Sequence, residues 1–332
     1  MTKSIAAYDM LAAREAAASD RAGEAEALMR MSHPASFVDP DRAIAASDRA
    51  AELGAAISNP TLAARATMLA ACWRNLLHGW NEADARSREA AAAVLRESGD
   101  EIPACGRLPY ARALLYESEY TKAIENAEQA LQELSGGDCF WAAPVALHVK
   151  ASALGYLGRL GETHLTLARG FELAQKDGNL EWLAVLSYTL VWLGWHSFDF
   201  SGMREFLAGA SQSSMSGLSL QNQLPLIAAE GFAHLAGKEY PAAIECFERV
   251  LDRPDQPKYM LAWRAEMLAR HGLGETWMAL GDLAKARVQP DAFVAVSSTG
   301  RDRYLAALSC EFGARLALDS LSRLGSEIAP GN

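Results

Sequence analysis

The sequence predicts an all-α protein built from antiparallel helix hairpins, and three observations support this fold class. Alanine and leucine dominate the 332 residues, and long stretches lack proline, a composition that favours helix throughout. The segments SEYTKAIENAEQAL, which begins at Ser118, and KEYPAAIECFERVL, which begins at Lys238, share one apolar pattern. Their tyrosines, Tyr120 and Tyr240, lie 120 residues apart, which indicates that the chain repeats one structural unit.

A fixed interval of 40 residues connects these two segments to the rest of the chain. A small residue follows each tyrosine by three positions, and steps of 40 from it meet comparable positions, with a final step of 43. Because periods of about 20–50 residues are typical of repeat proteins, we expect a repeat array over residues 38–300. Thr163 and Met203 are larger than alanine and predict looser packing in their units. The seven marker positions are Ala43, Ala83, Ala123, Thr163, Met203, Ala243 and Ala286, and three residues before them stand Pro40, Trp80, Tyr120, Leu160, Phe200, Tyr240 and Leu283.

Each unit is expected to contain two helices, as the segment LGETWMALGDLAKA from Leu273 to Ala286 illustrates. Its apolar residues recur at helical spacing, and the dipeptide at 281–282 ends one helix and caps the next. Two helices approach closely only where one of them carries a small side chain. We therefore expect Gly274 and Ala286 to be the contact points of this hairpin.

The two ends of the chain are expected to close the array, because each repeat buries its face only against a neighbour. Residues 1–37 form an N-terminal helical segment in this interpretation, with one helix over residues 4–31. Residues 301–332 form a C-terminal capping helix and tail, with the helix over residues 302–324. The most apolar stretch, residues 180–195, is shorter than the roughly 20 apolar residues of a membrane span, so we expect a buried helix there.

The pattern resembles the tetratricopeptide repeat family, although the interval is 40 residues rather than the 34 of that family's consensus. The resemblance covers residues 38–300 and implies a right-handed α-solenoid superhelix with a concave groove. The longer units are similar to the repeat domains of bacterial signalling ATPases and of maltose-regulon activators. The matching residues are Leu273, Gly274, Trp277, Gly281, Asp282 and Ala286; Gly231, Tyr240, Ala243, Ile244 and Phe247; and Tyr120, Ala123, Ile124, Ala127 and Ala130.

Charge and cysteine usage limit the partners and the compartment. The 31 basic and 41 acidic residues give a net charge of −10, and no basic run occurs, so we expect neither nucleic acid nor an anionic membrane as a partner. The five cysteines are widely separated and form no CxxC pair, which indicates a reduced chain without a zinc knuckle. The N-terminus is interrupted by charges and does not have the pattern of a signal peptide, so a cytoplasmic protein is expected.

Motifs for phosphate binding, serine hydrolysis and zinc proteolysis are absent, so we expect no catalytic centre, cofactor or metal site. His271 and Glu275, with Glu266 nearby, are the only arrangement that suggests metal ligands. Two ligands on one helix face do not make a site, and an exposed ion pair is the favoured interpretation.

Two other pairs of polar residues have similar alternatives. His196 and Asp199 could form an acid–base pair, but a histidine at a helix C-terminus beside a capping aspartate is the simpler explanation. Glu230 and His234 are spaced to form a structural hydrogen-bonded pair on one helix.

A ligand would be expected in the concave groove, which the first helix of each hairpin lines in the resembling family. Aromatic side chains and histidines gather in the middle units of this groove, and aromatic residues dominate binding hot spots. Trp192 and Trp195 also suit a buried helix stripe, so both core and groove remain open for them. The candidate groove residues are Arg112, Tyr116, His148, Ser152, Tyr156, Tyr188, Trp192, Trp195, His196, Phe232, His271 and Glu275.

The function expected from this pattern is a non-catalytic binding or scaffold module that takes part in protein–protein interaction or signalling. It would hold a protein, a peptide or a small-molecule effector, and a homo-oligomer is possible. Two alternatives stay open: a sensor segment of a larger ATPase-type transcriptional regulator, and an enzyme on a helical-repeat scaffold that uses groove histidines.

Overall fold

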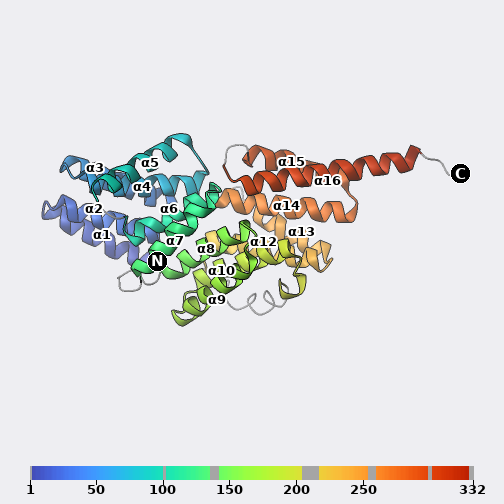
Figure 1. The fold of residues 1–332 in the computed structure, drawn as a ribbon, viewed down its shortest axis with the longest axis horizontal. Coiled ribbons are helices and arrows are strands. Elements are labelled where there is room, and N and C mark those ends of the chain that lie inside the picture. Colours follow the sequence, from blue (N-terminus) through green and yellow to red (C-terminus); the bar gives the residue numbers. More distant parts are fainter. Residues whose placement is uncertain are drawn as a thin grey trace. The chain divides into compact units, whose positions relative to one another are not determined.

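The computed structural model is helical throughout the parts of the chain that it describes (Figure 1). These parts are residues 2–99, 102–134, 142–203, 217–252, 259–297 and 301–328. No strand occurs within these ranges, which confirms the predicted all-α class. No helix in the same ranges combines the length and apolar character needed to cross a bilayer, and the apolar stretch from residue 180 is a helix with largely buried side chains, as predicted.

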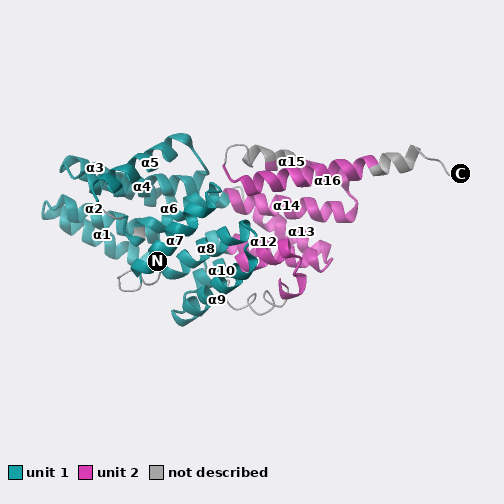
Figure 2. Ribbon diagram, viewed as in Figure 1, with its two compact units in different colours: residues 1–186, 216–222, 256–262 teal, residues 187–215, 223–255, 263–332 magenta. Residues whose placement is uncertain are grey.

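The chain divides into two compact units (Figure 2). Unit 1 consists of residues 1–186, 216–222 and 256–262, and unit 2 consists of residues 187–215, 223–255 and 263–332. The helices of the first half are α1 (Thr2–Ala17), α2 (Arg21–Ala35), α3 (Pro40–Ala56), α4 (Pro60–His78), α5 (Glu82–Glu97), α6 (Ala104–Tyr116), α7 (Tyr120–Leu134), α8 (Ala143–Tyr156) and α9 (Leu160–Lys176). They are followed by α10 (Leu180–Ser197), α12 (Leu220–Ala236), α13 (Tyr240–Leu251), α14 (Ala262–Leu280), α15 (Leu283–Ser297) and α16 (Arg303–Ile328).

Unit 1 is built from helices that pack against their neighbours in the sequence. From α1 to α5 each helix packs on the next, and the same holds from α6 to α9. In addition, α4 contacts both α2 and α6, and α6 contacts α8. The even-numbered helices α2, α4, α6 and α8 therefore form a continuous row within this unit, in which each member also touches an odd-numbered helix.

The 40-residue interval agrees with the observed helix starts. Helices α3, α7, α9, α13 and α15 begin at the residue three positions before their marker. The markers of these helices are fully buried, and Met203 is 2% exposed. Met203 packs against Gly194, and a Cβ added to this glycine would lie 3.3 Å from the Cβ of Met203. Because glycine has no side chain, Met203 fits closely, and the expected loose packing is not found there.

Ala83 is the exception, because it is exposed. Helix α5 begins at Glu82, two residues later than the interval predicts, so Ala83 is its second residue rather than its fourth. Two residues correspond to a rotation of about 200° around a helix, which turns this position toward solvent. The buried face of α5 is instead formed by Arg88, Ala91, Ala92 and Leu95.

Five of the turns inside the hairpins share one backbone form. Its central residue has a positive φ, and the residue after it donates its N–H to a carbonyl five positions earlier, which is the longer hydrogen bond of a Schellman turn. The side chain at this position varies, so the turn is conserved in geometry and not in residue type. The residues are Ser118, Gly158, Phe198, Lys238 and Gly281, with φ of 61°, 75°, 58°, 60° and 79°.

The N-terminal segment differs from the prediction of a single helix over residues 4–31, which is wrong. Helices α1 and α2 are separated by residues 18–20, where Ser19 has φ 61°. Asp20 begins α2 because its Oδ1 accepts the N–H of Gly23 at 2.9 Å. The Ser-Asp pair in the sequence is the capping signal that the prediction missed.

Close helix contacts in unit 2 are made where a glycine faces a phenylalanine. A Cβ on Gly272 would lie 2.1 Å from the Phe247 ring, and one on Gly231 would lie 2.7 Å from the same ring. Gly274 and Ala286 were expected to meet in one hairpin. The structure corrects this expectation, since Gly274 faces Phe312 of α16, 2.4 Å from where its Cβ would be.

Candidate functional site

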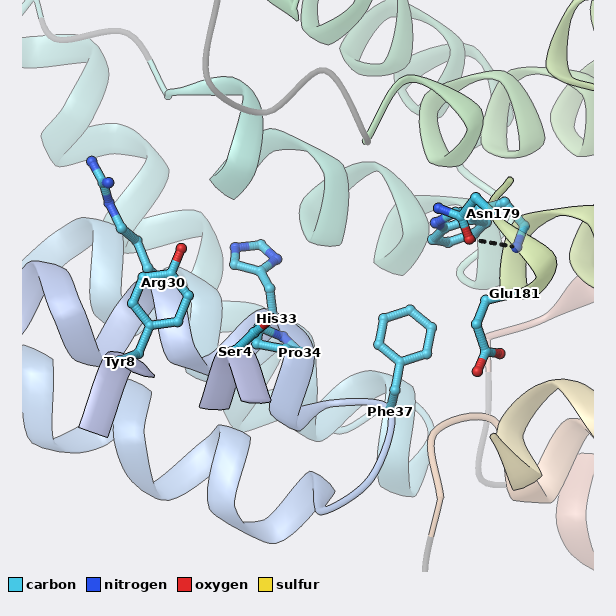
Figure 3. A pocket seen from close by; sticks show the side chains of 9 residues that line it. Ser4, Tyr8, Arg30, His33, Pro34, Phe37, Asn179 and Glu181 are labelled. Carbon is cyan, nitrogen blue, oxygen red and sulfur yellow. Dashed lines mark hydrogen bonds between the residues drawn. The ribbon is translucent and has the colours of Figure 1, made fainter. Parts of the chain in front are cut away.

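A pocket of about 300 Å³ opens in unit 1 between the first two helices and the start of α10 (Figure 3). We call it the outer compartment. Figure 3 shows the side chains of α1 and α2 on one side and Asn179 and Glu181 on the other, with Phe37 between them. Its lining residues are Ser4 and Tyr8 from α1, Arg30, His33 and Pro34 from α2, Phe37 from the following turn, and Asn179, Glu181 and Trp182 at the start of α10.

Local sequence explains how α2 presents its part of the pocket. Pro34 lies in the last turn of α2 and has no N–H, so it cannot donate to the carbonyl of Arg30. The chain leaves the helix just beyond it, where the Oγ of Ser36 donates to the carbonyl of His33 at 2.7 Å. This helix end carries His33 and Phe37 to the pocket.

The opposite wall is held by the carboxylate of Glu181. Its Oε1 accepts the backbone N–H of Ser219 at 2.7 Å, and its Oε2 accepts the Ser219 hydroxyl at 2.9 Å and the Asn222 side-chain amide at 2.6 Å. Asn179 Oδ1 accepts the backbone N–H of Trp182 at 3.3 Å. Because its oxygens are already engaged by these donors, Glu181 fixes the wall rather than offering a strong free charge to the pocket.

Aromatic rings form the floor of the pocket. Phe37 and Trp182 meet edge to face with centroids 6.0 Å apart, and His33 meets Trp73 in the same way at 5.4 Å. Trp73 is held by the bond from its Nε1 to the Ser32 hydroxyl at 3.1 Å. Desolvation lowers the pKa of His33 to about 4, so its ring is neutral at pH 7 and can donate one hydrogen bond and accept another.

A smaller inner compartment of about 30 Å³ shares His33, Phe37 and Trp182 with the outer one. Its lining is mostly apolar and includes one charged residue, Arg112 of α6, which is 6% exposed. Unit 1 therefore has two adjacent compartments with aromatic walls, and the inner one is lined by a buried cation. The other inner residues are Ser36, Trp73, Leu108, Pro109, Ala142 and Val145.

The candidate groove residues of unit 1 lie on α6 and α8. Arg112 and Tyr116 are buried on α6, and Arg112 is the one candidate that the pocket includes. On α8, His148 and Ser152 are buried, with the Ser152 hydroxyl 3.5 Å from the histidine Nδ1. Tyr156 is half-buried and packs on Tyr120 with ring centroids 5.2 Å apart.

The candidate groove residues of unit 2 form an aromatic cluster. Trp192 is 9% exposed and contacts Phe232 at a centroid distance of 5.4 Å and Tyr304 at 5.7 Å, so it belongs to the core of this unit. Trp195 is half-buried and packs on the same Phe232 at 5.0 Å. Tyr188 is half-buried as well.

The polar pairs of unit 2 differ in part from the sequence interpretation. His271 and Glu275 are not an exposed pair. The two side chains do meet, with Nε2 of His271 3.7 Å from Oε1 of Glu275, but both are largely buried. His271 is 3% exposed among Phe232, Phe293 and Phe312, and Glu275 also pairs with Arg315. Burial lowers the pKa of His271 to about 3. No group of three or more potential metal ligands occurs in the described part of the chain.

Of the other two predicted pairs, one is found in part and the other has a different partner. Asp199 caps the next helical turn through the N–H of Gly202 at 3.1 Å, as predicted, while the exposed His196 bonds to the hydroxyl of Tyr304. The predicted bond between His234 and Glu230 is not formed. Its Nδ1 lies 2.6 Å from the carboxylate of Glu239, because the hairpin turn brings residue 239 back toward it.

Sequence reasoning missed the outer compartment entirely. Its residues come from the first 37 positions, which were interpreted as a cap, and from positions 179–182, which were interpreted as a loop and a buried helix. The one available signal was the His33-Pro34 pair at a helix end. No model of a known protein family matches this chain, and no curated protein matches its sequence.

Proposed function

We propose that this chain is a non-catalytic binding protein of the tetratricopeptide type whose unit 1 holds a small ligand in the outer compartment. The observation that carries the proposal is the cavity itself. Its volume of about 300 Å³ lies at the lower end of the range for small-molecule sites, which is roughly 300–1,000 Å³. Aromatic walls with a few polar groups are the usual composition of such sites.

The type of fold in this proposal is supported by the repeating features of the helices. The buried marker positions and the recurring hairpin turn favour a right-handed α-solenoid, in which successive hairpins stack. We also propose a cytoplasmic location, since the described cysteines Cys72, Cys246 and Cys310 are free thiols.

Intrinsic fluorescence tests the proposal because Trp182 lines the cavity. The purified chain is titrated with small carboxylates, amines, sugars and short peptides. A matched control is Trp277→Phe, which removes an indole that lies outside the pocket and packs under the Lys285 ammonium at 4.0 Å. We expect a saturable change in the wild type and in the Trp277→Phe variant that is lost in Trp182→Phe.

Two results would contradict the proposal. One is the absence of a saturable change with any compound. The other is a change that persists in full in the Trp182→Phe variant, since the ligand would then bind elsewhere.

A further inference from the structure

Arg112 differs from every other arginine of comparable burial in the described part of the chain. Arg88 pairs with Glu117, Arg107 with Glu133, and Arg264 with Asp302. No ion pair or hydrogen bond of the described residues includes Arg112. Its Nε is buried without a hydrogen-bond partner, as are those of Arg88 and Arg107, but these two have a carboxylate on their terminal nitrogens. The four side chains are similarly enclosed, with exposed fractions of 2%, 8%, 8% and 6% for Arg88, Arg107, Arg264 and Arg112.

An uncompensated guanidinium in this position is costly. An arginine keeps its charge at any pH that a protein experiences, so Arg112 cannot become neutral as a buried lysine or histidine can. Buried charges are normally paired with an opposite charge, because removal from water is otherwise unfavourable. We therefore infer that an anion from outside the described residues neutralises the charge of Arg112.

The inner compartment limits the size and charge of that anion. Its volume of about 30 Å³ exceeds the roughly 10–15 Å³ needed for one water molecule, and its lining beside Arg112 is apolar. A carboxylate brings one negative charge and leaves no net charge beside Arg112. A phosphate group brings up to two charges and three oxygens, so it would leave excess charge among Leu108, Ala142 and Val145.

The outer compartment indicates what is attached to the carboxylate. The two compartments share the lining residues His33, Phe37 and Trp182, so they are adjacent. These rings suit an apolar or aromatic body. His33 is uncharged at pH 7, and Glu181 is engaged by Ser219 and Asn222, so the middle of the cavity offers no strong partner for a second charge.

We propose that the two compartments bind small aromatic monocarboxylates, with the carboxylate paired to Arg112 in the inner compartment and the ring packed against Phe37 and Trp182 in the outer one. This inference rests on the proposed function, because it names the ligand class of the same cavity. It assigns to Arg112 a role in anion recognition that no feature of the repeat pattern requires.

The experiment measures binding by calorimetry with three probes of nearly equal shape. Phenylacetate carries the carboxylate, 2-phenylacetamide is its uncharged counterpart, and benzylphosphonate carries the larger anion. The proteins are the wild type, Arg112→Met, Arg112→Lys, and Arg86→Met as a control that removes an exposed cation of unit 1 outside both compartments. Circular dichroism checks that each variant is folded.

We expect phenylacetate to bind the wild type and the Arg86→Met variant equally well. In Arg112→Met its affinity should fall about 10- to 100-fold, the usual effect of losing a hydrogen bond between charged groups. Arg112→Lys should retain part of the affinity because it keeps the charge without the planar fork. The amide should bind all proteins weakly and equally.

Several outcomes would overturn the inference. Equal binding of acid and amide, or unchanged phenylacetate affinity in Arg112→Met, would show that the carboxylate does not meet Arg112. Stronger binding of benzylphosphonate would assign the site to a phosphate-type anion. If no acid binds but other compounds still change Trp182 fluorescence, this inference fails while the proposed function stands; if neither occurs, both fail.

Discussion

The buried ion pair between Arg88 of α5 and Glu117 gives the sharpest test of how unit 1 is held together. The pair is bidentate, with Nη1 to Oε1 at 2.8 Å and Nη2 to Oε2 at 2.7 Å. Asn75 of α4 donates to the same Oε1 at 2.8 Å. Glu117 is 6% exposed and Arg88 is 2% exposed, so three helical segments meet at a carboxylate that water hardly reaches.

Replacing Glu117 with leucine would leave the Arg88 charge buried without its partner. Loss of one member of such a pair costs about 3–5 kcal/mol of unfolding free energy. At about 2–4 °C per kcal/mol for a unit of this size, the melting temperature should fall by about 6–20 °C. The thiol of Cys72 near Arg88 is buried, and this burial raises its pKa to about 12. Little water can therefore reach Arg88 to reduce the loss of stability.

The double variant Arg88→Met, Glu117→Leu is the decisive comparison. Apolar side chains of similar volume remove both charges, so most of the lost stability should return. The assay is thermal unfolding followed by circular dichroism for the wild type, both single variants and the double variant, with Arg86→Met as a control, because Arg86 and Glu82 form an exposed pair on the same helix. A loss below about 1 kcal/mol in Glu117→Leu, or a double variant no more stable than the single ones, would refute the reasoning.

Three further predictions follow from unit 2 and the turns. The pKa of His271 is lowered to about 3 in the folded chain, against 6.5 in the unfolded chain, so the free energy of unfolding should fall by about 5 kcal/mol in total as the pH decreases from 6.5 toward 3. In His271→Asn the free energy of unfolding should depend less on pH over this range, and an unchanged acid unfolding curve would contradict the assignment. Gly272→Ala should destabilise by about 1–3 kcal/mol through its clash with Phe247, and the same change in a Phe247→Leu background should cost clearly less in a chemical denaturation cycle; equal costs would rule out the clash. Positions 238 and 158 both have a positive φ, which favours glycine. Lys238→Gly should therefore raise the melting temperature, through a stability gain of up to about 1 kcal/mol, and Gly158→Ala should lower it. A shift of the opposite sign in either variant would argue against the turn geometry.

The helices were predictable because their pattern is local and repeats. Tyr120, Leu160 and Tyr240 each begin a helix, and the buried alanines follow from the need for close approach between helices. The exposed Ala83 shows the limit of this reasoning, since a delay of two residues in one helix start changes the face without changing the interval. The pair of His271 and Glu275 was mistaken only in its exposure, because Phe312 and Arg315 of another helix cover it. The pair of His234 was mistaken because its partner comes from the hairpin turn.

The candidate site was not predictable in the same way, because its residues have no common motif or interval. Tyr8 and Trp182 are far apart in the sequence, and packing within unit 1 places both at one cavity. Arg112 was selected as a groove position, but the sequence contains many acidic residues that could have paired with it. Only the folded structure shows that Arg112 has no acidic partner among the described residues.

The uniform hairpin turns have a practical consequence for labelling this protein. Tight turns at residues 117–119, 157–159, 237–239 and 281–282 join the helices within hairpins. The connections between hairpins range from residues 57–59, where Ser58 and Asn59 form the same turn, to residues 252–261. One residue added inside a helix turns its small-residue face by about 100°, so changes in length are best tolerated in the long connections. The step of 43 between Ala243 and Ala286 contains one of the long connections. Epitope tags or fluorophore-binding peptides are therefore best inserted in the long connections and kept out of the tight turns, including those around Ser58 and Gly178.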